Sequence, residues 1–380
     1  MQPLDGVRII AVEQYGAGPY GSMLMAELGA EIVKIEAPSM GGDVSRKVGP
    51  HFLGDEDSLF FQAFCRSKKS VALEIKTPEG RADFESLVEK ADAVINNLRG
   101  EQPEKLKLTY DHLKALKPSI VCAHLSAYGR DNHRASWPGY DYLMQAEAGF
   151  LSVTGEPDAP PTRFGLSMVD YMAGAQMALG CVSAIMRARQ TGEGCDIDVS
   201  LFDTAIHQLT YPALWALNGG HVVSRLPRGA HPSLSPSQAV KTKDGWGFVM
   251  CQTDKFWHAL CESLNRIDLT ADDNFSSMEQ RRINRDALTP ILDEEFQKKT
   301  SEQWMEVLAG KAPFAPIYDL ERALQNNFLD ELGLIEKVYH PDMKDGELKM
   351  LASPIKVNSK RPAGHRAPKL GEHTSDFLDK

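Results

Sequence analysis

The stretch VRIIAVEQYGAGPYGSMLMAELGAEIVKIE, residues 7–36, decides the fold of this chain. Its first apolar run predicts a buried strand over Val7–Glu13, and its last predicts a second strand over Glu31–Glu36. The segment between them predicts a helix over Gly21–Leu28. Because a helix separates the two strands, the unit predicts parallel strand pairing and an α/β fold.

The turn before this helix, Gly16–Gly21, reads GAGPYG and fits the G-x-G-x-x-G pattern of dinucleotide-binding units. Glu36 ends the second strand 20 residues after Gly16, where an acidic ligand of an NAD ribose would stand. An NAD-dependent oxidoreductase is therefore one hypothesis. Backbone N–H groups at a helix N-terminus suit any phosphate or carboxylate, so the pattern supports a Rossmann-like unit more firmly than it supports NAD.

The alternation of strands and helices continues to about residue 200. It predicts a parallel, doubly wound sheet in this part of the chain. The further strands are expected at Ser70–Leu73, Ala93–Asn96, Ile120–Leu125 and Asp196–Leu201, and the further helices at Pro78–Ala91, Tyr110–Leu116 and Asp170–Gln190.

The pattern changes after residue 200. The segment Arg225–Ser237, RLPRGAHPSLSPS, is rich in Gly, Pro and Ser and predicts a linker or an ordered active-site loop. The tail, Asp342–Pro368, returns to strand-like and turn-rich sequence. Between them a second unit is expected from Val240, with two short strands around Asp244–Gly245 and helices at Asp254–Leu264, Met278–Leu292 and Ser301–Leu308.

The composition excludes some classes of protein. The chain of 380 residues has a formal net charge of −10, which argues against a dedicated nucleic-acid binder. No run reaches the roughly 18 apolar residues that a membrane helix needs, and the N-terminus lacks the pattern of a signal peptide. The six cysteines include no C-x-x-C pair, and the eleven histidines show no metal-ligand spacing. These features predict a cytoplasmic protein with free thiols and no metal.

The chain also carries a series of short motifs in a fixed order from residue 3 to residue 374. They are the opening stretch Pro3–Asp43, then Lys68–Leu73, Lys76–Gly80, Val94–Leu98, Ser126–Gly129, Pro138–Asp141, Gly165–Asp170, Thr191–Gly194 and Leu370–Thr374. Together they resemble the class III CoA-transferases, the family of formyl-CoA transferase and carnitine CoA-transferase. An ordered set over nearly the whole chain is far more specific than one glycine motif.

The resemblance implies an architecture and a reaction. Each chain would have a large Rossmann-like domain of residues 1–200 with 326–380, a linker of residues 201–224 and a small α/β domain of residues 225–325. Two such chains would form an interlocked homodimer. The implied reaction moves CoA between two carboxylic acids, so the partners would be an acyl-CoA and a free carboxylic acid. Coenzyme A would be a substrate, with no permanently bound cofactor.

Asp170 matches the family's catalytic aspartate. From the sequence alone, its place at the start of an apolar helix is typical of an N-cap residue. The resemblance implies a second role, in which the carboxylate attacks an acyl-CoA to form an aspartyl anhydride and then an aspartyl-CoA thioester. We expect the helix N-terminus to lower the pKa of Asp170 and keep its carboxylate ionised for this attack.

Tyr140 is expected at the mouth of the active site, where formyl-CoA transferase also has a tyrosine. The related alpha-methylacyl-CoA racemases read GHD here, whereas this chain reads Gly139-Tyr140-Asp141. A phenol, with a reference pKa of about 10, poorly replaces imidazole as an acid or base at neutral pH. The substitution favours CoA transfer and leaves a racemase-like isomerase as an alternative.

The residues expected to hold CoA also follow from the resemblance, by position. Gly16 and Ala37 stand where formyl-CoA transferase has a glutamine and an arginine. The first change predicts a wider acyl pocket, and the second predicts a weaker or relocated phosphate contact. The expected contacts are Lys76 and Lys105 near the nucleotide, Arg99 on a phosphate, and Gly16, Ala17, Leu73, Asn97 and Leu98 along the rest of the molecule.

Arginines are candidates for holding the far carboxylate of a dicarboxylic substrate through bidentate pairing. On this basis short dicarboxylates such as succinate or mesaconate are the preferred substrate class. Oxyanion donors are expected in Arg228–Gln238, with His231 as a further lining residue, although HPSLSPS replaces the glycine-rich loop of formyl-CoA transferase. The arginine candidates are Arg46, Arg163, Arg225 and Arg228.

Overall fold

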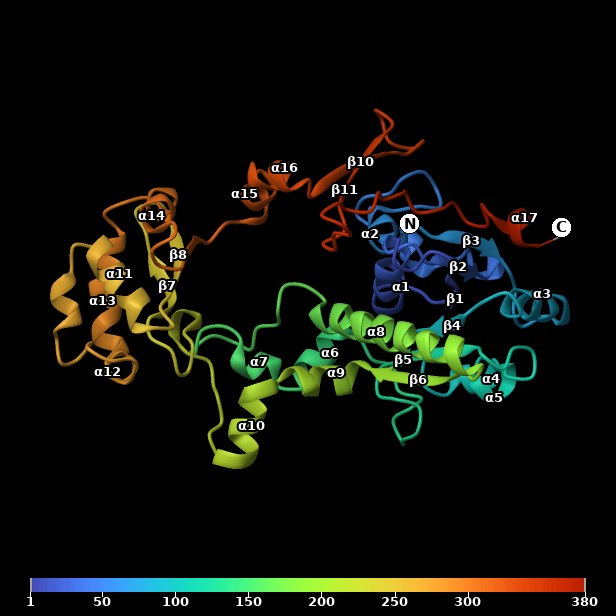
Figure 1. The fold of residues 1–380 in the computed structure, drawn as a ribbon, viewed down its shortest axis with the longest axis horizontal. Helices are drawn as coiled ribbons and strands as arrows, with labels where there is room; N and C mark the ends of the chain where they lie inside the picture. The colour runs from blue at the N-terminus through green and yellow to red at the C-terminus, as the bar shows by residue number, and fades with distance from the viewer. Residues whose placement is uncertain (1, 379–380) are drawn as a thin grey trace. The chain divides into compact units, whose positions relative to one another are not determined.

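The computed structural model describes residues 2–378, which divide into two compact units (Figure 1). The first unit contains the chain up to Ala148, then Gly165–Leu209, then the chain from Asn327 onward. The second unit contains Gly149–Phe164 and Thr210–Asn326. The segment Gly149–Phe164 therefore belongs with the second unit, whereas the sequence analysis placed it inside the large domain.

The first unit is built on a six-stranded sheet with the strand order β3-β2-β1-β4-β5-β6, in which every pair is parallel. The prediction of an α/β fold with a parallel sheet is confirmed, and two strands have the predicted bounds. The chain order reverses between β1 and β4, which makes this the topological switch point of the sheet. The strands are β1 Arg8–Val12, β2 Glu31–Glu36, β3 Lys69–Ala72, β4 Ala93–Asn96, β5 Val121–Ser126 and β6 Cys195–Ser200.

The rest of the first unit consists of helices, loops and one hairpin. The C-terminal tail returns to the sheet, where the N–H of His373 donates to the carbonyl of Ser70 on β3 (2.9 Å). The helices are α1 Ala17–Glu27, α2 Leu59–Cys65, α3 Pro78–Val88, α4 Gln102–Lys105, α5 Tyr110–Leu113, α6 Asp141–Glu147, α8 Met168–Thr191, α9 Leu201–Gln208, α16 Phe328–Leu332 and α17 Thr374–Phe377, and the antiparallel hairpin is β10 Ile335–Tyr339 with β11 Glu347–Leu351.

The second unit packs helices against the antiparallel sheet β7-β8-β9 around buried Trp257 and Phe296. Arg225 ties Gly149–Phe164 to this unit by donating to the carbonyls of Glu156 (3.1 Å) and Ala159 (2.6 Å). One helix predicted over Met278–Leu292 is two helices, because Asn284 leaves helical geometry (φ −96°, ψ 25°). The elements are α7 Phe150–Val153, α10 Thr210–Gly219, β7 Ser237–Lys241, β8 Trp246–Met250, α11 Asp254–Ser263, α12 Met278–Ile283, α13 Arg285–Phe296, α14 Ser301–Leu308, β9 Phe314–Pro316 and α15 Leu320–Leu324.

The crossing of α1 and α8 positions the functional part of the first unit. A Cβ atom added at Gly21 on α1 would lie 2.4 Å from the carbonyl oxygen of Gly174 on α8. A Cβ atom added at Gly174 would lie 2.4 Å from the carbonyl oxygen of Ala17. Since real Cβ atoms do not approach an oxygen so closely, the two backbones can touch only where both residues are glycine.

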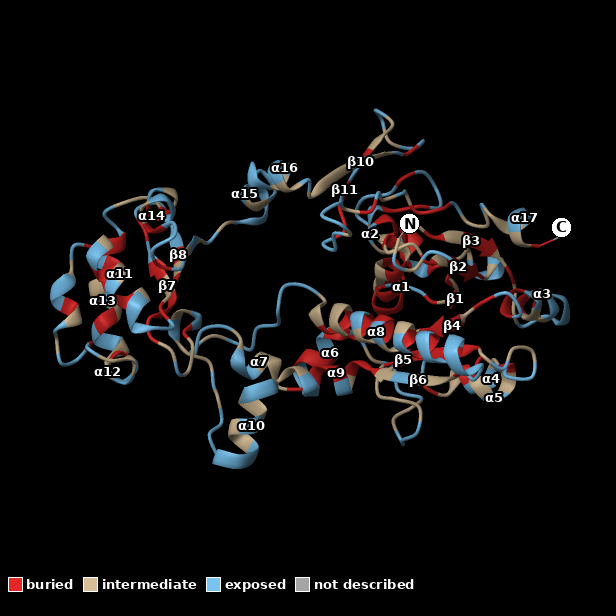
Figure 2. Ribbon diagram, viewed as in Figure 1, coloured by how far each residue is buried: buried red, intermediate tan, exposed pale blue. Residues whose placement is uncertain are grey.

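Helix α8 is the core helix of the first unit. Within residues 2–378 it is the one helix long and apolar enough, by length and mean hydropathy, to cross a membrane, although it contains no unbroken run of 18 apolar residues. One side of α8 is buried and the other is exposed (Figure 2). A buried core helix passes the same test, because its contacts with other helices and the sheet also require apolar residues.

The helix crossing predicts that Gly174→Ala destabilises the protein by about 1–3 kcal/mol, because the added methyl group must push the two backbones apart. Gly180→Ala on the same helix is the matched control, since its Cβ would meet only the side-chain methyl of Ile197, at 3.0 Å. Alanine also has the higher helix propensity, so the control variant should be close to neutral. Chemical denaturation of both variants measures the difference, and equal stabilities would contradict the close crossing.

Candidate active site

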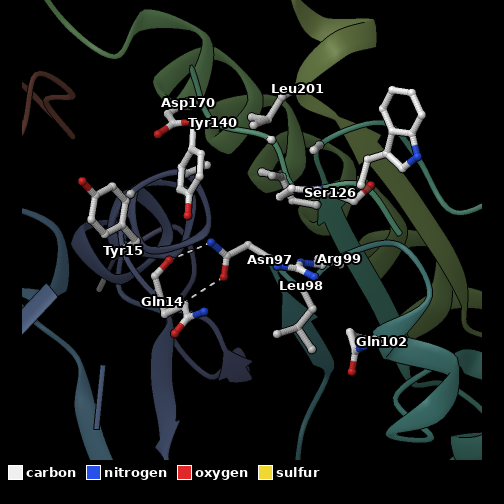
Figure 3. Close-up of a pocket in the computed structure, with 17 residues that line it drawn as sticks. Gln14, Tyr15, Asn97, Leu98, Arg99, Gln102, Ser126, Tyr140, Asp170 and Leu201 are labelled. Atoms are coloured by element: carbon white, nitrogen blue, oxygen red, sulfur yellow. Dashed lines mark hydrogen bonds between the residues drawn. The ribbon is translucent and has the colours of Figure 1, made fainter. Parts of the chain in front are cut away.

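A cavity of about 390 Å³ lies at the switch point of the sheet in the first unit (Figure 3). Its walls come from the loop after β1, the segment after β4 and the segment after β5, with Tyr140 and Asp170 at one side. Ligands of open parallel sheets bind outside the carboxyl ends of the strands at such a point. The cavity is therefore the candidate active site.

Asp170 lies directly against the start of α1. A Cβ atom added at Gly16, the residue that precedes α1, would lie 3.0 Å from Oδ2 of Asp170. Gly16 leaves room for the carboxylate beside the first turn of α1. The first turn of a helix has backbone N–H groups without intrahelical acceptors, so this turn favours negative charge near Asp170.

The position and ionisation of Asp170 differ from the expectation. Ser167, not Asp170, is the N-cap of α8, and Asp170 is the third residue of the helix, in its first turn and 9% exposed. Burial, and then the charge of Asp141, raise the pKa of Asp170 to about 7. The expected lowering of this pKa was wrong, because burial and a like charge both penalise the ionised carboxylate.

Asn97 clamps the loop before α1. Its Oδ1 accepts from the N–H of Gln14 (2.9 Å), and its Nδ2 donates to the carbonyl of Gln14 (2.7 Å). Gly18 faces Asn97, where an added Cβ would lie 2.8 Å from the Asn97 side chain. Each glycine of the GAGPYG motif thus has a packing reason: Gly16 faces Asp170, Gly18 faces Asn97, and Gly21 faces α8.

A group of buried, charged side chains also holds the loop before α1 in place. The N–H of Tyr15 donates to Asp43 (3.1 Å), Asp43 pairs with Lys34 (2.8 Å), and Lys34 donates to the carbonyl of Glu13 (2.8 Å). Lys68 pairs with the Glu13 carboxylate (2.7 Å). Burial alone would raise the pKa of Asp43, but the Lys34 ammonium and hydrogen bonds from Ser45 hold it at about 2. The loop therefore rests on fixed, ionised groups.

The carboxylate of Glu36 is not free to bind a ribose. It is 2% exposed, and its carboxylate accepts from Arg46 Nε (2.8 Å) and Nη2 (2.7 Å), from Ser70 Oγ (2.6 Å) and from the N–H of Asp43 (2.9 Å). The NAD hypothesis loses its acidic ligand, because Glu36 is fully used inside the protein. Arg46 is occupied in the same way and is not a candidate for a substrate carboxylate.

The predicted CoA residues fall into three places. Gly16, Ala17, Asn97, Leu98 and Arg99 line the first cavity. Leu73 and Lys76 line a neighbouring cavity of about 180 Å³, together with Ala37. Gln14 and Leu98 line both cavities, so the two are adjacent; together they are called the trench, which lies across the ends of β3, β2, β1 and β4. Lys105 lies outside this trench, where its ammonium pairs with Glu101 (3.5 Å).

The remaining candidates belong to the second unit. Arg228 is paired with Asp293 through two hydrogen bonds (2.6 and 2.7 Å). The ring of His231 meets the hydroxyl of Tyr211 (3.1 Å), and burial and Arg285 lower its pKa. Arg225 donates to backbone carbonyls as described above, and Arg163 donates to the carbonyl of Phe164 (2.8 Å). Arg225 and Arg228 are thus already engaged within their own unit.

Sequence reasoning missed two residues beside Asp170. Asp141 is buried (4% exposed), and its Oδ2 accepts from the N–H of Asp170 (2.9 Å). Tyr15 has a left-handed backbone (φ 71°) and lies near Asp170 at the cavity (Figure 3); burial and Asp170 raise its pKa. The signals were present, since Asp141 ends the PGYD motif and Tyr15 precedes the GAGPYG turn.

The comparisons with known proteins agree with this geometry. A sequence model of the family described as "CoA-transferase family III" matches residues 4–374. The chain belongs to this family. The CoA-transferase is 31% identical to the succinyl-CoA:mesaconate CoA-transferase of Haloarcula marismortui, over 100% of this chain and 96% of the relative. It is 32% identical to the acetyl-CoA:oxalate CoA-transferase of Acetobacter aceti, over 97% of this chain and 93% of the relative.

A solved structure gives the same result. The crystal structure of a CaiB/BaiF family protein from Brucella suis superposes with a TM-score of 0.85 at 29% identity, covering 99% of this chain and 98% of that one. The likeness thus covers both units of the CoA-transferase, and its GAGPYG motif serves this fold rather than a dinucleotide site.

The raised pKa of Asp170 predicts that Asp170→Asn stabilises the CoA-transferase at pH 8. Because the pKa of this carboxyl group is higher in the folded than in the unfolded state, the protein loses stability as pH rises through about 7. Above that pH the cost is on the order of 4 kcal/mol. The gain should shrink toward zero near pH 3, where the carboxyl group is mostly protonated in both states. Denaturation at several pH values measures it.

Asp196→Asn is the matched control with the opposite sign. Burial would raise the pKa of Asp196, but hydrogen bonds from His124 and the N–H of Tyr110 lower it overall. This variant should therefore lose stability at pH 8. A destabilised Asp170→Asn at pH 8 would show that Asp170 is not held in an unfavourable ionised state.

Proposed function

We propose that this CoA-transferase moves CoA from an acyl-CoA to a short dicarboxylic acid through covalent intermediates on Asp170. The observation that carries the proposal is a single carboxylate, almost buried, at the side of the switch-point cavity and against the glycine that begins α1. A nucleophile needs one open approach and fixed surroundings, and Asp170 has both.

The transfer would run in four exchanges of bonds. The Asp170 carboxylate attacks the thioester carbonyl, the C–S bond breaks and CoA leaves as a thiolate, which gives an acyl-aspartyl anhydride. The thiolate attacks the aspartyl carbonyl and expels the donor acid, which gives an aspartyl-CoA thioester. The acceptor carboxylate attacks this thioester and releases the thiolate again. The thiolate then attacks the new acyl carbonyl and frees Asp170.

Each attack places negative charge on a carbonyl oxygen, which needs hydrogen-bond donors. The first turn of α1 supports this role, since Gly16 lies against Asp170 and the N–H groups of Ala17 and Gly18 have no acceptor within α1. We place the oxyanion donors here, and the segment Arg228–Gln238 stays a second expectation. Tyr140, 64% exposed at the rim, would contact the substrate.

CoA would lie along the trench formed by the two cavities. The thioester would sit beside Asp170, the pantetheine arm would pass Leu98, and the nucleotide would reach the second cavity near Leu73 and Lys76. The exposed guanidinium of Arg99 and the ammonium of Lys76 are the cations for its phosphates. Lys105, outside the trench, stays a weaker expectation.

The relatives support dicarboxylic acids as substrates. The names of the two reported relatives include mesaconate and oxalate, both short dicarboxylic acids. We further propose a homodimer working in the cytoplasm. Exposed apolar side chains on α8, Leu179 (70%) and Met186 (62%), are suited to contact with a second chain, and the six cysteines are free thiols. Light scattering that gives a monomer mass would contradict the dimer.

Incubation with succinyl-CoA followed by hydroxylamine should give a hydroxamate on Asp170, detected by mass spectrometry of the digested protein. Hydroxylamine attacks both the anhydride and the thioester, so the label reports the covalent intermediates. Asp170→Ala should lose the label and CoA transfer together, and full transfer by this variant would refute the proposal. Exchange of the α proton without CoA transfer would indicate the racemase-like isomerase, and a substrate-dependent change in nicotinamide absorbance would indicate the oxidoreductase.

Lys76→Glu should raise the KM for the CoA ester about five-fold or more and leave kcat nearly unchanged, because reversing one exposed charge weakens a phosphate contact away from the reacting atoms. Lys90→Glu is the control, since Lys90 is also exposed and lines neither cavity of the trench. The effect should fall with added salt. Equal KM values for the two variants would place the nucleotide elsewhere.

A further inference from the structure

A second buried carboxylate touches the backbone of the nucleophile. Asp141 is the first residue of α6, and its Oδ2 accepts from the N–H of Asp170 on α8 (2.9 Å). Its Oδ1 accepts from Nε2 of Gln145, one turn further along α6 (2.6 Å). Asp141 is 4% exposed and Gln145 is fully buried. Two helices thus meet through one carboxylate that is held on both oxygens.

The contact between Asp141 and the N–H of Asp170 caps the N-terminus of α8. The N-cap of α8 is Ser167, whose side chain makes no capping hydrogen bond within the described residues, whereas Asp141 from α6 accepts an N–H of the first turn. A neutral asparagine could accept the same bond. A buried aspartate next to another carboxylate costs stability, so capping alone does not explain the charge.

We propose that Asp141 is a positioning residue for CoA transfer: it holds the backbone of Asp170 and keeps a second negative charge beside the nucleophile. The inference rests on the proposed role of Asp170 as the covalent centre. Asp141 acts through Asp170 and is not itself placed in contact with the reacting atoms.

The surroundings single out the charge of Asp141. Phenols lie around the pair: Tyr15 from the loop after β1 acts on Asp170, and Tyr171 from α8 acts on both carboxylates. Tyr140 and Tyr142, at the start of α6, act in turn on Tyr15. Helix α1 has no acidic residue in its first turn. After burial, Asp141 is the one charge that raises the pKa of Asp170 among the described groups, in agreement with the geometry.

In the first half of the transfer a more basic Asp170 has two chemical advantages, whereas in the last step it is the poorer leaving group. It is a stronger nucleophile toward the thioester. In the anhydride, moreover, the CoA thiolate can attack either carbonyl. Attack on the acyl carbonyl breaks the C–O bond to Asp170 and returns the substrate, whereas attack on the aspartyl carbonyl breaks the C–O bond to the donor acid and continues the transfer. The weaker base leaves more readily, so a donor acid with an ordinary carboxylic pKa of about 4 leaves in preference to Asp170.

The test is the pH dependence of kcat/KM with succinyl-CoA for the wild type, Asp141→Asn and Asp141→Ala. The wild-type rate should rise with pH to a plateau, with a midpoint near 7, because only the ionised Asp170 attacks. Asp141→Asn keeps an acceptor for the Asp170 N–H and removes the charge, so its midpoint should fall by about one pH unit or more. Its plateau should be several-fold lower, and Asp141→Ala, which also loses the acceptor, should be slower still.

Asp57→Asn is the matched control. Asp57 is also buried next to a helix start, and its carboxylate accepts from the N–H of Ser58 (2.7 Å) and from Nε2 of Gln62 (2.6 Å), but it does not line the trench. This variant should lose stability and keep the wild-type midpoint. If Asp141→Asn does not fold, as judged by circular dichroism, Asp141→Ser removes the same charge in a smaller side chain.

The two proposals fail in different ways. A wild-type protein without the hydroxylamine label on Asp170 refutes the proposed function. A labelled wild type together with an Asp141→Asn or Asp141→Ser variant whose midpoint stays at the wild-type value, or rises, overturns only the role of Asp141.

Discussion

The contact between α1 and α8 through Gly21 and Gly174 is the constraint on which the candidate site depends. The two helices touch through their backbones, which brings the start of α1 against the first turn of α8. Gly16 then meets the Asp170 carboxylate beside the first turn of α1. Helices separated by side chains would lie 8–10 Å apart at their axes, as is usual for packed helices, and would leave a wider gap at this point.

The candidate nucleophile, Asp170, is therefore surrounded by rigid groups. The loop before α1 is clamped by Asn97 from one side and supported by the ionised pair of Lys34 and Asp43 from below. Buried ion pairs of this kind contribute little net stability, but breaking one leaves an unpaired charge, so the loop has a single favoured arrangement. Preorganisation suits the proposed reaction, in which four attacks on carbonyl carbons follow one another at the same site.

Asp170 and Asp141 show the cost of this arrangement. Two carboxylates are buried side by side, and the folded protein holds one of them near its titration point at neutral pH. Proteins keep such unfavourable groups where chemistry requires them and offset the cost elsewhere in the fold. The large buried sheet of the first unit and the packing of α8 supply that stability.

The sequence by itself predicted the parallel sheet, the approximate places of its strands, the CoA-transferase family and Asp170 as the candidate nucleophile, because apolar periodicity and motif order can be read along the chain. It could not predict that Asp141 contacts Asp170 or that Glu36 and Arg46 neutralise each other, since these partners lie 29 and 10 residues apart and meet only in the fold. The pKa of Asp170 was predicted in the wrong direction for the same reason. A helix start can be read from neighbouring residues, whereas burial and a like charge from another helix depend on the tertiary structure alone.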